Sequence, residues 1–173
     1  MTFANIRNQG ISPSEILQQE RARLAERNMS GDSLKFLSAN TRLLDDYFRR
    51  SFEISLTGPV MDLVKNPYAI IALGGYGRKE QCLASDVDLL FLFRGEIPAS
   101  ADDLIREVIY PLWDMGIEVG HATRSVAECV TMAAKDFDLF TPLLDARFIC
   151  GISPLFSGLM DQLENAVISK NAD

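Results

Sequence analysis

The stretch DVDLLFLF at residues 86–93 places the strongest constraint on the fold. Its last five residues are apolar, and a run that is apolar on both alternating faces predicts a strand covered on both sides of its sheet. Asp86 and Asp88 open this strand. Because side chains alternate along a strand, the two aspartates share one face, with their Cα atoms about 6.5–7 Å apart. The sequence therefore predicts two carboxylates at the mouth of a buried strand.

A glycine-rich turn lies upstream of this pair. The apolar run YAIIAL at residues 68–73 predicts another buried strand, and Gly74, Gly75, Gly77 and Arg78 follow it. Glycines let backbone N–H groups approach a phosphate closely, and an arginine adds positive charge. The turn lacks the third glycine of a dinucleotide-binding fingerprint and the GK[ST] end of a Walker A loop. We predict that it binds phosphate in a different way from either.

The turn and the aspartates together indicate a nucleotide site. Two carboxylates at one edge repel each other unless a cation lies between them. Mg²⁺ (or Mn²⁺) takes one or two protein carboxylates and completes its shell with water and phosphate oxygens. Alone, a spaced aspartate pair is often a strand-end turn. At this spacing we predict that Asp86 and Asp88 hold a metal, the metal holds a nucleoside triphosphate, and Ser85 is among the nucleotide-binding residues.

A third carboxylate usually completes phosphoryl-transfer chemistry with two metal ions. The segment GIEVGHATR at residues 116–124 predicts a third strand, in which Glu118 shares a face with small residues. Glu118 is therefore the catalytic candidate. Asp114, near the end of the preceding helix, is the alternative, although a capping or surface role suits it better.

Other residues near these motifs have ordinary explanations. His121 is the only histidine, and we expect it in the core or in support of the site. Trp113 is expected in the core. Arg124 and Arg147 could reach a triphosphate or could form surface ion pairs.

Two capping boxes mark helix starts, at Ser12–Glu15 and Ser125–Glu128. Gly151 is placed to end a helix and Ser153 to begin the last one. The predicted helices cover about residues 12–28, 33–52, 101–115, 125–135 and 137–149, and a final segment from 153.

The composition narrows the class of partner. Hydrophobic residues make up 47% of the 173 residues, and the formal net charge is −7. An acidic chain without a basic stripe does not resemble a nucleic-acid binder, so we expect no polynucleotide partner. The three cysteines are far apart, the start of the chain has no apolar signal segment, and no stretch approaches 18 apolar residues. We therefore expect a cytoplasmic protein with no membrane partner.

Three segments together resemble a known superfamily. They read GGYGRKEQCLASDVDLL, PLWDMGIEVGHATRS and LLDARFICG. They are similar to the nucleotidyltransferase superfamily, which includes DNA polymerase β. The similarity is closer to the N-terminal domain of the bacterial PII uridylyltransferase/uridylyl-removing enzymes, and it covers about residues 33–165. One residue departs from the pattern: Gln81 stands where leucine is usual, and since it lies beside the motif we expect it to be without consequence.

The resemblance implies an α/β (α+β) fold with a mixed sheet flanked by helices. It also implies transfer of a nucleotidyl group, here uridylyl, from a nucleoside triphosphate to an acceptor hydroxyl with release of pyrophosphate. The acceptor in that family is a tyrosine of PII, a protein of nitrogen regulation and signal transduction. The expected organisation is an N-terminal helical extension (1–57), a nucleotidyltransferase core (58–135) and C-terminal helices (136–173) that lead towards a further region.

Alternatives remain open at this point. A regulatory module could bind a nucleotide without catalysis, and an antibiotic-type transferase would modify a small molecule instead of a protein. The role of Glu118 discriminates between an enzyme and a sensor. The sequence leaves open the nucleotide base, the acceptor, the oligomeric state, and whether the chain is a fragment or a stand-alone relative.

Overall fold

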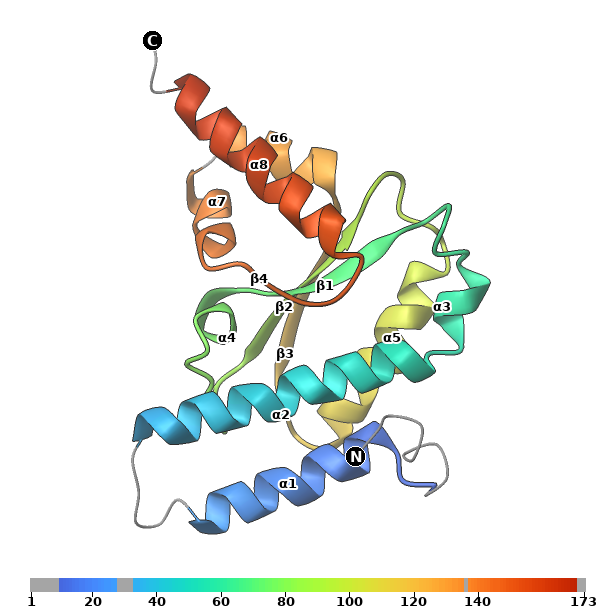
Figure 1. Ribbon diagram of the computed structural model, residues 1–173, viewed down its shortest axis with the longest axis vertical. Coiled ribbons are helices and arrows are strands. Elements are labelled where there is room, and N and C mark those ends of the chain that lie inside the picture. Colours follow the sequence, from blue (N-terminus) through green and yellow to red (C-terminus); the bar gives the residue numbers. More distant parts are fainter. Residues whose placement is uncertain (1–9, 28–32, 136, 171–173) are drawn as a thin grey trace.

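A mixed four-stranded sheet lies between two layers of helices in the computed structural model, which describes residues 10–27, 33–135 and 137–170 (Figure 1). The strand order is β3-β2-β1-β4, in which β1 is antiparallel to β2 and β4, and β2 is parallel to β3. This confirms the predicted fold class. The strands are β1 (Tyr68–Ala72), β2 (Val87–Phe93), β3 (Val119–Ser125) and β4 (Arg147–Gly151).

The two faces of the sheet bury different residues of the same strand. Val87, Leu89 and Phe91 pack towards α2 and α5, whereas Leu90 and Leu92 pack towards α6, α7 and α8. Both faces are therefore apolar, as the run at residues 86–93 predicts. The helices are α1 (Pro13–Arg27), α2 (Ser33–Ile54), α3 (Thr57–Val60), α4 (Gly74–Gly77), α5 (Ala101–Asp114), α6 (Val126–Lys135), α7 (Phe137–Leu144) and α8 (Ser153–Lys170).

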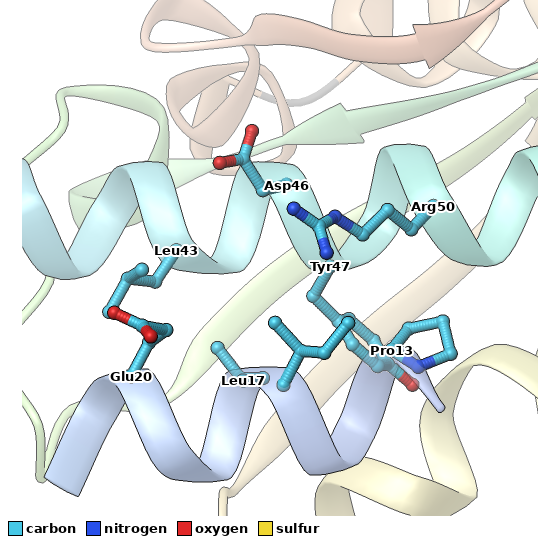
Figure 2. Close-up of a pocket in the computed structure, with 8 residues that line it drawn as sticks. Pro13, Leu17, Glu20, Leu43, Asp46, Tyr47 and Arg50 are labelled. Carbon is cyan, nitrogen blue, oxygen red and sulfur yellow. The ribbon is translucent and has the colours of Figure 1, made fainter. Parts of the chain in front are cut away.

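The N-terminal helical pair is joined closely to the sheet. In α2, Leu44 and Phe48 are fully buried in the core beneath the sheet. The capping box that begins α1 is confirmed, since the N–H of Glu15 donates to Ser12 Oγ (3.2 Å) and the N–H of Ser12 donates to the Glu15 carboxylate (2.7 Å). Helix α1 lies along α2, and a cavity of about 240 Å³ lies between them. Figure 2 shows Leu17 of α1 and Tyr47 of α2 among the residues that line it.

The sequence expectations for residues 137–151 and for Trp113 are wrong. The helix predicted over 137–149 ends at Leu144, and residues 147–151 form β4 instead. The physical reason is that β1 is buried along its whole length and needs a hydrogen-bonding partner at its second edge. Gly151 thus closes β4 and ends no helix. Trp113, expected in the core, is 46% exposed and stacks on Tyr110.

The third strand also begins later than predicted. Gly116 has φ +72° and Ile117 donates to the carbonyl of Leu112 (2.9 Å), so the first residues of the predicted strand form the turn that ends α5.

None of the helices in the described ranges is long and apolar enough to cross a lipid bilayer.

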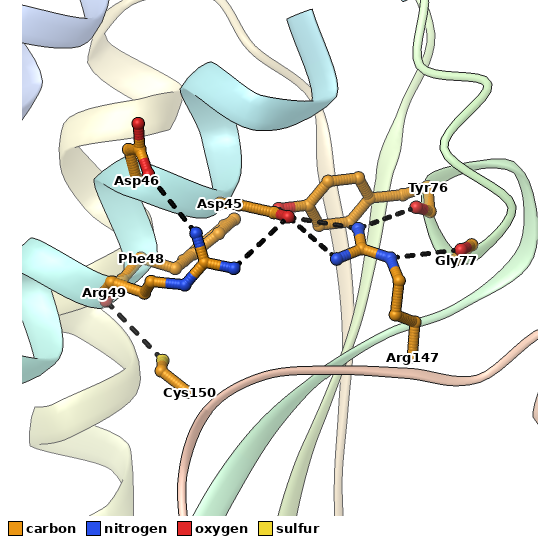
Figure 3. A network of polar contacts seen from close by, with 8 residues as sticks. All are labelled: Asp45, Asp46, Phe48, Arg49, Tyr76, Gly77, Arg147 and Cys150. Atoms are coloured by element: carbon orange, nitrogen blue, oxygen red, sulfur yellow. Dashed lines mark hydrogen bonds and ion pairs between the residues drawn. The ribbon is translucent and has the colours of Figure 1, made fainter. Parts of the chain in front are cut away.

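A buried polar network joins α2, α4 and β4 (Figure 3). The guanidinium of Arg147 donates to both carboxylate oxygens of Asp45 (2.8 and 3.1 Å) and to the carbonyls of Tyr76 and Gly77 (both 3.1 Å). The hydroxyl of Tyr76 donates to Asp45 (2.7 Å), and burial followed by the Asp45 charge raises the pKa of Tyr76 well above its usual value. Arg147 therefore holds the glycine turn against α2. The sequence left open whether Arg147 reaches a triphosphate or forms a surface ion pair, and in the structure it forms a largely buried ion pair with Asp45.

We predict that Arg147→Met destabilises the fold far more than Arg49→Met. The Asp45 carboxylate is 8% exposed, so removing its buried partner should cost about 3–5 kcal/mol of unfolding free energy. Arg49 is 46% exposed and lies 3.6 Å from the same carboxylate, so its loss should cost at most about 1 kcal/mol. Urea unfolding of both variants measures the difference, and equal losses would contradict the role given to Arg147.

Candidate active site

The glycine turn is the short helix α4, which begins where β1 ends. The N–H groups of Gly74, Gly75 and Tyr76 lie in its first turn, where no acceptor exists within the helix. Leu73, at the N-cap, supplies no side-chain cap. By contrast, the N–H of Gly77 donates to the carbonyl of Leu73 (2.9 Å). Three backbone donors are thus left at the end of α4 that faces β2, an arrangement suited to an anion.

The structure places different requirements on the three glycine positions of the turn. Gly74 has φ +52°, a conformation that disfavours other residues. Gly75 has no such φ, and an added Cβ would meet nothing closer than Arg78 Nη2 at 3.8 Å. An added Cβ at Gly77 would overlap the carbonyl oxygen of Asp145. Gly77 is therefore explained by packing and Gly74 by its φ, whereas neither packing nor φ requires glycine at position 75.

Asp88 is exposed to solvent on one side and lies between two glycines. A Cβ built on Gly120 would lie 2.7 Å from Asp88 Oδ1, and one built on Gly74 would lie 3.5 Å from Asp88 Oδ2. The register of the parallel pair places Asp88 directly opposite Gly120. Burial, and after it the charge of Asp86, raises the pKa of Asp88 above its usual value. The carboxylate thus lies in a narrow space with a like charge close by.

Glu118 lies one residue before β3 and is exposed. Its carbonyl accepts the N–H of Val87 (2.9 Å), so continuing the register places Glu118 beside Asp86 at the mouth of the two strands. Asp114 is the last residue of α5 and is also exposed. Among the described residues no group of three or more His, Cys, Asp or Glu side chains could hold a metal ion. The choice of Glu118 or Asp114 as third carboxylate stays a prediction.

The chemistry of Asp86 and Asp88 still fits Mg²⁺. This ion is commonly held by one or two carboxylates together with water and substrate phosphates, so a cage of protein ligands is not needed. Partial burial, and after it the charge of Asp86, raises the pKa of Asp88, so the surroundings disfavour its ionised form and a cation would relieve this. Ser85, the residue before the pair, is exposed, and its carbonyl is held within the loop by Gln81.

A cavity of about 470 Å³ opens beside Asp88. Gly74, Arg78 and Gly120 lie on the side of the turn and strands, and Pro142 comes from α7. Its volume lies in the range of small-molecule sites. The full lining is Leu73, Gly74, Arg78, Asp88, Leu89, Gly120, His121, Ala122, Thr141, Pro142 and Asp145.

His121 does not lie in the core, which was one of the two places expected from the sequence. Its side chain is exposed, and its ring lies 6.4 Å from those of Phe91 and Trp113. The strand that carries it is at the edge of the sheet, so the alternation that suggested burial leads to a partly open surface. His121 instead contributes to the cavity lining.

Arg78 lies at the rim of the cavity and is already paired. Its Nε donates to Glu80 (2.9 Å) and its Nη1 to Asp145 (2.6 Å), and the hydrogen bond with Glu80, followed by that with Asp145, raises its pKa. The side chain is 47% exposed. A phosphate at the glycine turn would therefore compete with Asp145 for this guanidinium.

The sequence analysis missed the residue that holds the loop before the aspartates. Gln81, expected to be without consequence, is 1% exposed and hydrogen-bonds the carbonyls of Ser85 and Asp86. The available signal was its departure from leucine in an otherwise matching motif. Such a departure is informative when the substituted residue is buried, because a buried amide needs partners.

Free N–H groups at a glycine turn, facing spaced aspartates on the neighbouring strand of a mixed sheet, define the class of nucleotidyltransferases. Residues 18–127 match the family described as "Putative nucleotidyltransferase DUF294". The chain belongs to this nucleotidyltransferase family.

A curated relative is similar over most of the chain. It is the bifunctional uridylyltransferase/uridylyl-removing enzyme of Rhodospirillum rubrum, 32% identical over 152 residues. The match takes in 86% of this chain and 16% of that enzyme. The similarity thus concerns one part of a much longer protein.

We predict that Gly75→Ala and Gly77→Ala separate binding from folding. Gly75→Ala should leave the free energy of unfolding within about 1 kcal/mol of wild type, because the added methyl group has space. It should weaken triphosphate binding about tenfold or more by obstructing a charge-assisted hydrogen bond. Gly77→Ala should cost about 3 kcal/mol or more of stability through overpacking.

Urea unfolding and calorimetric titration with a nucleoside triphosphate measure these two effects. Normal triphosphate affinity in a folded Gly75→Ala protein would show that this end of α4 does not contact phosphate.

We predict that Asp88→Asn stabilises the protein at pH 7. The raised pKa of Asp88 means that its contribution to stability is present below the usual value of 3.8 and is lost as the pH rises through the higher pKa of the folded state. The variant should therefore unfold at a higher temperature than wild type at pH 7, and the gap should close towards pH 4. Thermal unfolding across this range tests it, with exposed Asp161 changed to Asn as control. A destabilised Asp88→Asn protein at pH 7 would contradict the electrostatic account.

Proposed function

We propose that this protein transfers a uridylyl group from UTP to a hydroxyl of a protein acceptor, with Mg²⁺ (or Mn²⁺) held by Asp86 and Asp88. The observation that carries the proposal is the position of Asp88 beside a glycine turn whose first N–H groups have no partner in their helix. When bound, the metal would neutralise charge on the phosphate oxygens. The roles below belong to the residues of the chain.

The turn binds and orients the triphosphate. The N–H groups of Gly74 and Gly75 donate to its phosphate oxygens, and Arg78 adds a cation at the rim after exchanging Asp145 for phosphate. Ser85 lies at the same mouth and contacts the nucleotide. Holding the triphosphate in one orientation lowers the entropic part of the barrier to transfer.

The chemical step exchanges one oxygen for another at the α-phosphorus. The acceptor hydroxyl oxygen forms a bond to this phosphorus, while the bond to the bridging oxygen breaks and pyrophosphate leaves. Glu118, beside Asp86, takes the proton of the hydroxyl. These assignments make Glu118 a proton acceptor, with Asp114 as the alternative carboxylate.

Two observations support the choice of substrates. The relative from Rhodospirillum rubrum is named for uridylyl transfer, which favours UTP. The formal net charge of −7 disfavours a polynucleotide acceptor. By the resemblance to PII uridylyltransferases, we propose a PII-like signalling protein of nitrogen regulation as the acceptor.

A second candidate is a nucleotide-binding regulatory module without catalysis. It is favoured by one observation: no cluster of three carboxylate, histidine or cysteine side chains occurs within the part of the chain that the structure describes. A module of this kind would bind the triphosphate and transfer nothing.

We expect Asp86→Asn and Asp88→Asn to lower turnover at least about 100-fold in transfer of labelled UMP to a PII-like acceptor, because each removes a metal ligand. Glu118→Gln should lose activity by a similar factor while UTP binding persists. Asp114→Asn tests the alternative carboxylate, which is also exposed, and should keep its activity if Glu118 is the proton acceptor.

The pattern of outcomes distinguishes the two candidates. Tight UTP binding by the wild-type protein with no transfer to any acceptor favours the regulatory module. Full activity in Asp88→Asn would contradict the assignment of the site. Loss in Asp114→Asn with full activity in Glu118→Gln would move the proton acceptor to Asp114.

A further inference from the structure

The backbone of the aspartate pair is held at three points, and only two of them belong to the sheet. The carbonyl of Asp88 accepts the N–H of Leu73 (3.0 Å), and the N–H of Val87 donates to the carbonyl of Glu118 (2.9 Å). Asp86, however, lies before β2, which begins at Val87. The strand ladder therefore reaches the peptide that follows Asp86, through the N–H of Val87, but it does not fix the peptide that precedes it, between Ser85 and Asp86.

Gln81 supplies the third point. Its Nε2 donates to the carbonyl of Asp86 (3.0 Å) and to that of Ser85 (2.7 Å). Both hydrogens of the amide are thus used, on two consecutive carbonyls. Gln81 is 1% exposed, so its amide depends on these two carbonyls for hydrogen-bond partners, although the carbonyls belong to exposed residues.

The N-terminal helices hold the same loop from behind. Asn40 of α2, which is fully buried, donates to the carbonyls of Gln81 (2.9 Å) and Cys82 (3.2 Å). Arg21 of α1 donates to the carbonyl of Leu83 (2.8 Å). Side chains from two helices and from the loop itself therefore hold the carbonyls of the segment that leads to Asp86.

We propose that Gln81, supported by Asn40, is a positioning residue that fixes Asp86 relative to Asp88. The inference rests on the proposed function, because it matters only if both aspartates hold the metal. The N–H of Val87 already holds the peptide plane after Asp86, and Gln81 adds the plane before it through the carbonyl of Ser85, so both planes that set the direction of the Asp86 side chain are fixed. Without the bonds from Gln81, the repulsion between the two carboxylates would turn Asp86 away from Asp88.

A packing role alone does not explain the residue. Leucine, the usual residue of the pattern that this chain resembles, fills a buried site without the cost of desolvating an amide. In this chain that cost is offset by bonds to the two residues at the metal end of the loop. Gln81 is thus a feature of this chain and not a requirement of the fold.

The test is Mn²⁺ binding, measured by electron paramagnetic resonance of free Mn²⁺ in the presence of UTP. Gln81→Met keeps the length of the side chain and removes both donors. The dissociation constant for Mn²⁺ should rise about 10–100-fold, as for other groups that orient metal ligands. Hydrogen exchange of peptides covering residues 82–88 should become faster in the same variant.

Two further variants complete the test, a second substitution at position 81 and a control at a distant position. Gln81→Leu places the residue of the family pattern and should fold, so it secures the test if Gln81→Met does not. Asn66→Leu removes a similar bond between an amide and a carbonyl, from Asn66 to Met61 (2.7 Å), far from the loop in sequence. It should lower stability and leave Mn²⁺ affinity unchanged.

Failure of this inference differs from failure of the proposed function. If Asp86→Asn abolishes Mn²⁺ binding but a folded Gln81 variant binds as wild type does, the positioning role is overturned and the metal site stands. If the Asp86→Asn variant binds Mn²⁺ as tightly as the wild-type protein does, the metal assignment fails, and the role of Gln81 fails with it.

Discussion

Repulsion between two neighbouring carboxylates at the mouth of a buried strand is the constraint on which the rest of the site depends. Burial and the charge of Asp86 both raise the pKa of Asp88, so the folded protein holds this pair at a cost. The surroundings confine the charge without neutralising it. Gly74 and Gly120 bring the backbone close to the carboxylate of Asp88. A side chain at position 120 would displace this carboxylate, and a residue other than glycine at position 74 would be strained by the positive φ. This arrangement underlies our proposal that a cation binds here together with the phosphates that accompany it.

The helices serve this site as much as they serve the core. Through Arg147, Asp45 and Tyr76, helix α2 and strand β4 fix α4, which carries the free N–H groups (Figure 3). Through Asn40 and Arg21, α2 and α1 fix the loop that leads to Asp86. The N-terminal helical pair, which the sequence suggests is an extension, therefore contacts the parts of the chain that we propose position the phosphates and the metal.

Local patterns predicted the elements that local physics determines. The apolar runs gave β1 and β2, the capping boxes gave the starts of α1 and α6, and the motif gave the class of protein. The errors concern relations across the chain. Residues 147–149 form a strand because β1 needs a partner, which no local window contains. His121 is exposed because its strand lies at the sheet edge, and Gln81 matters because the loop folds back over it.

The central claim is that the aspartate pair binds a metal that holds a nucleoside triphosphate. Calorimetric titration of the protein with UTP, first with Mg²⁺ and then with EDTA, tests this most directly. The account predicts measurable UTP binding with Mg²⁺ and a loss of most of that affinity with EDTA, because the triphosphate then meets two uncompensated carboxylates. Equal affinity under both conditions would contradict it.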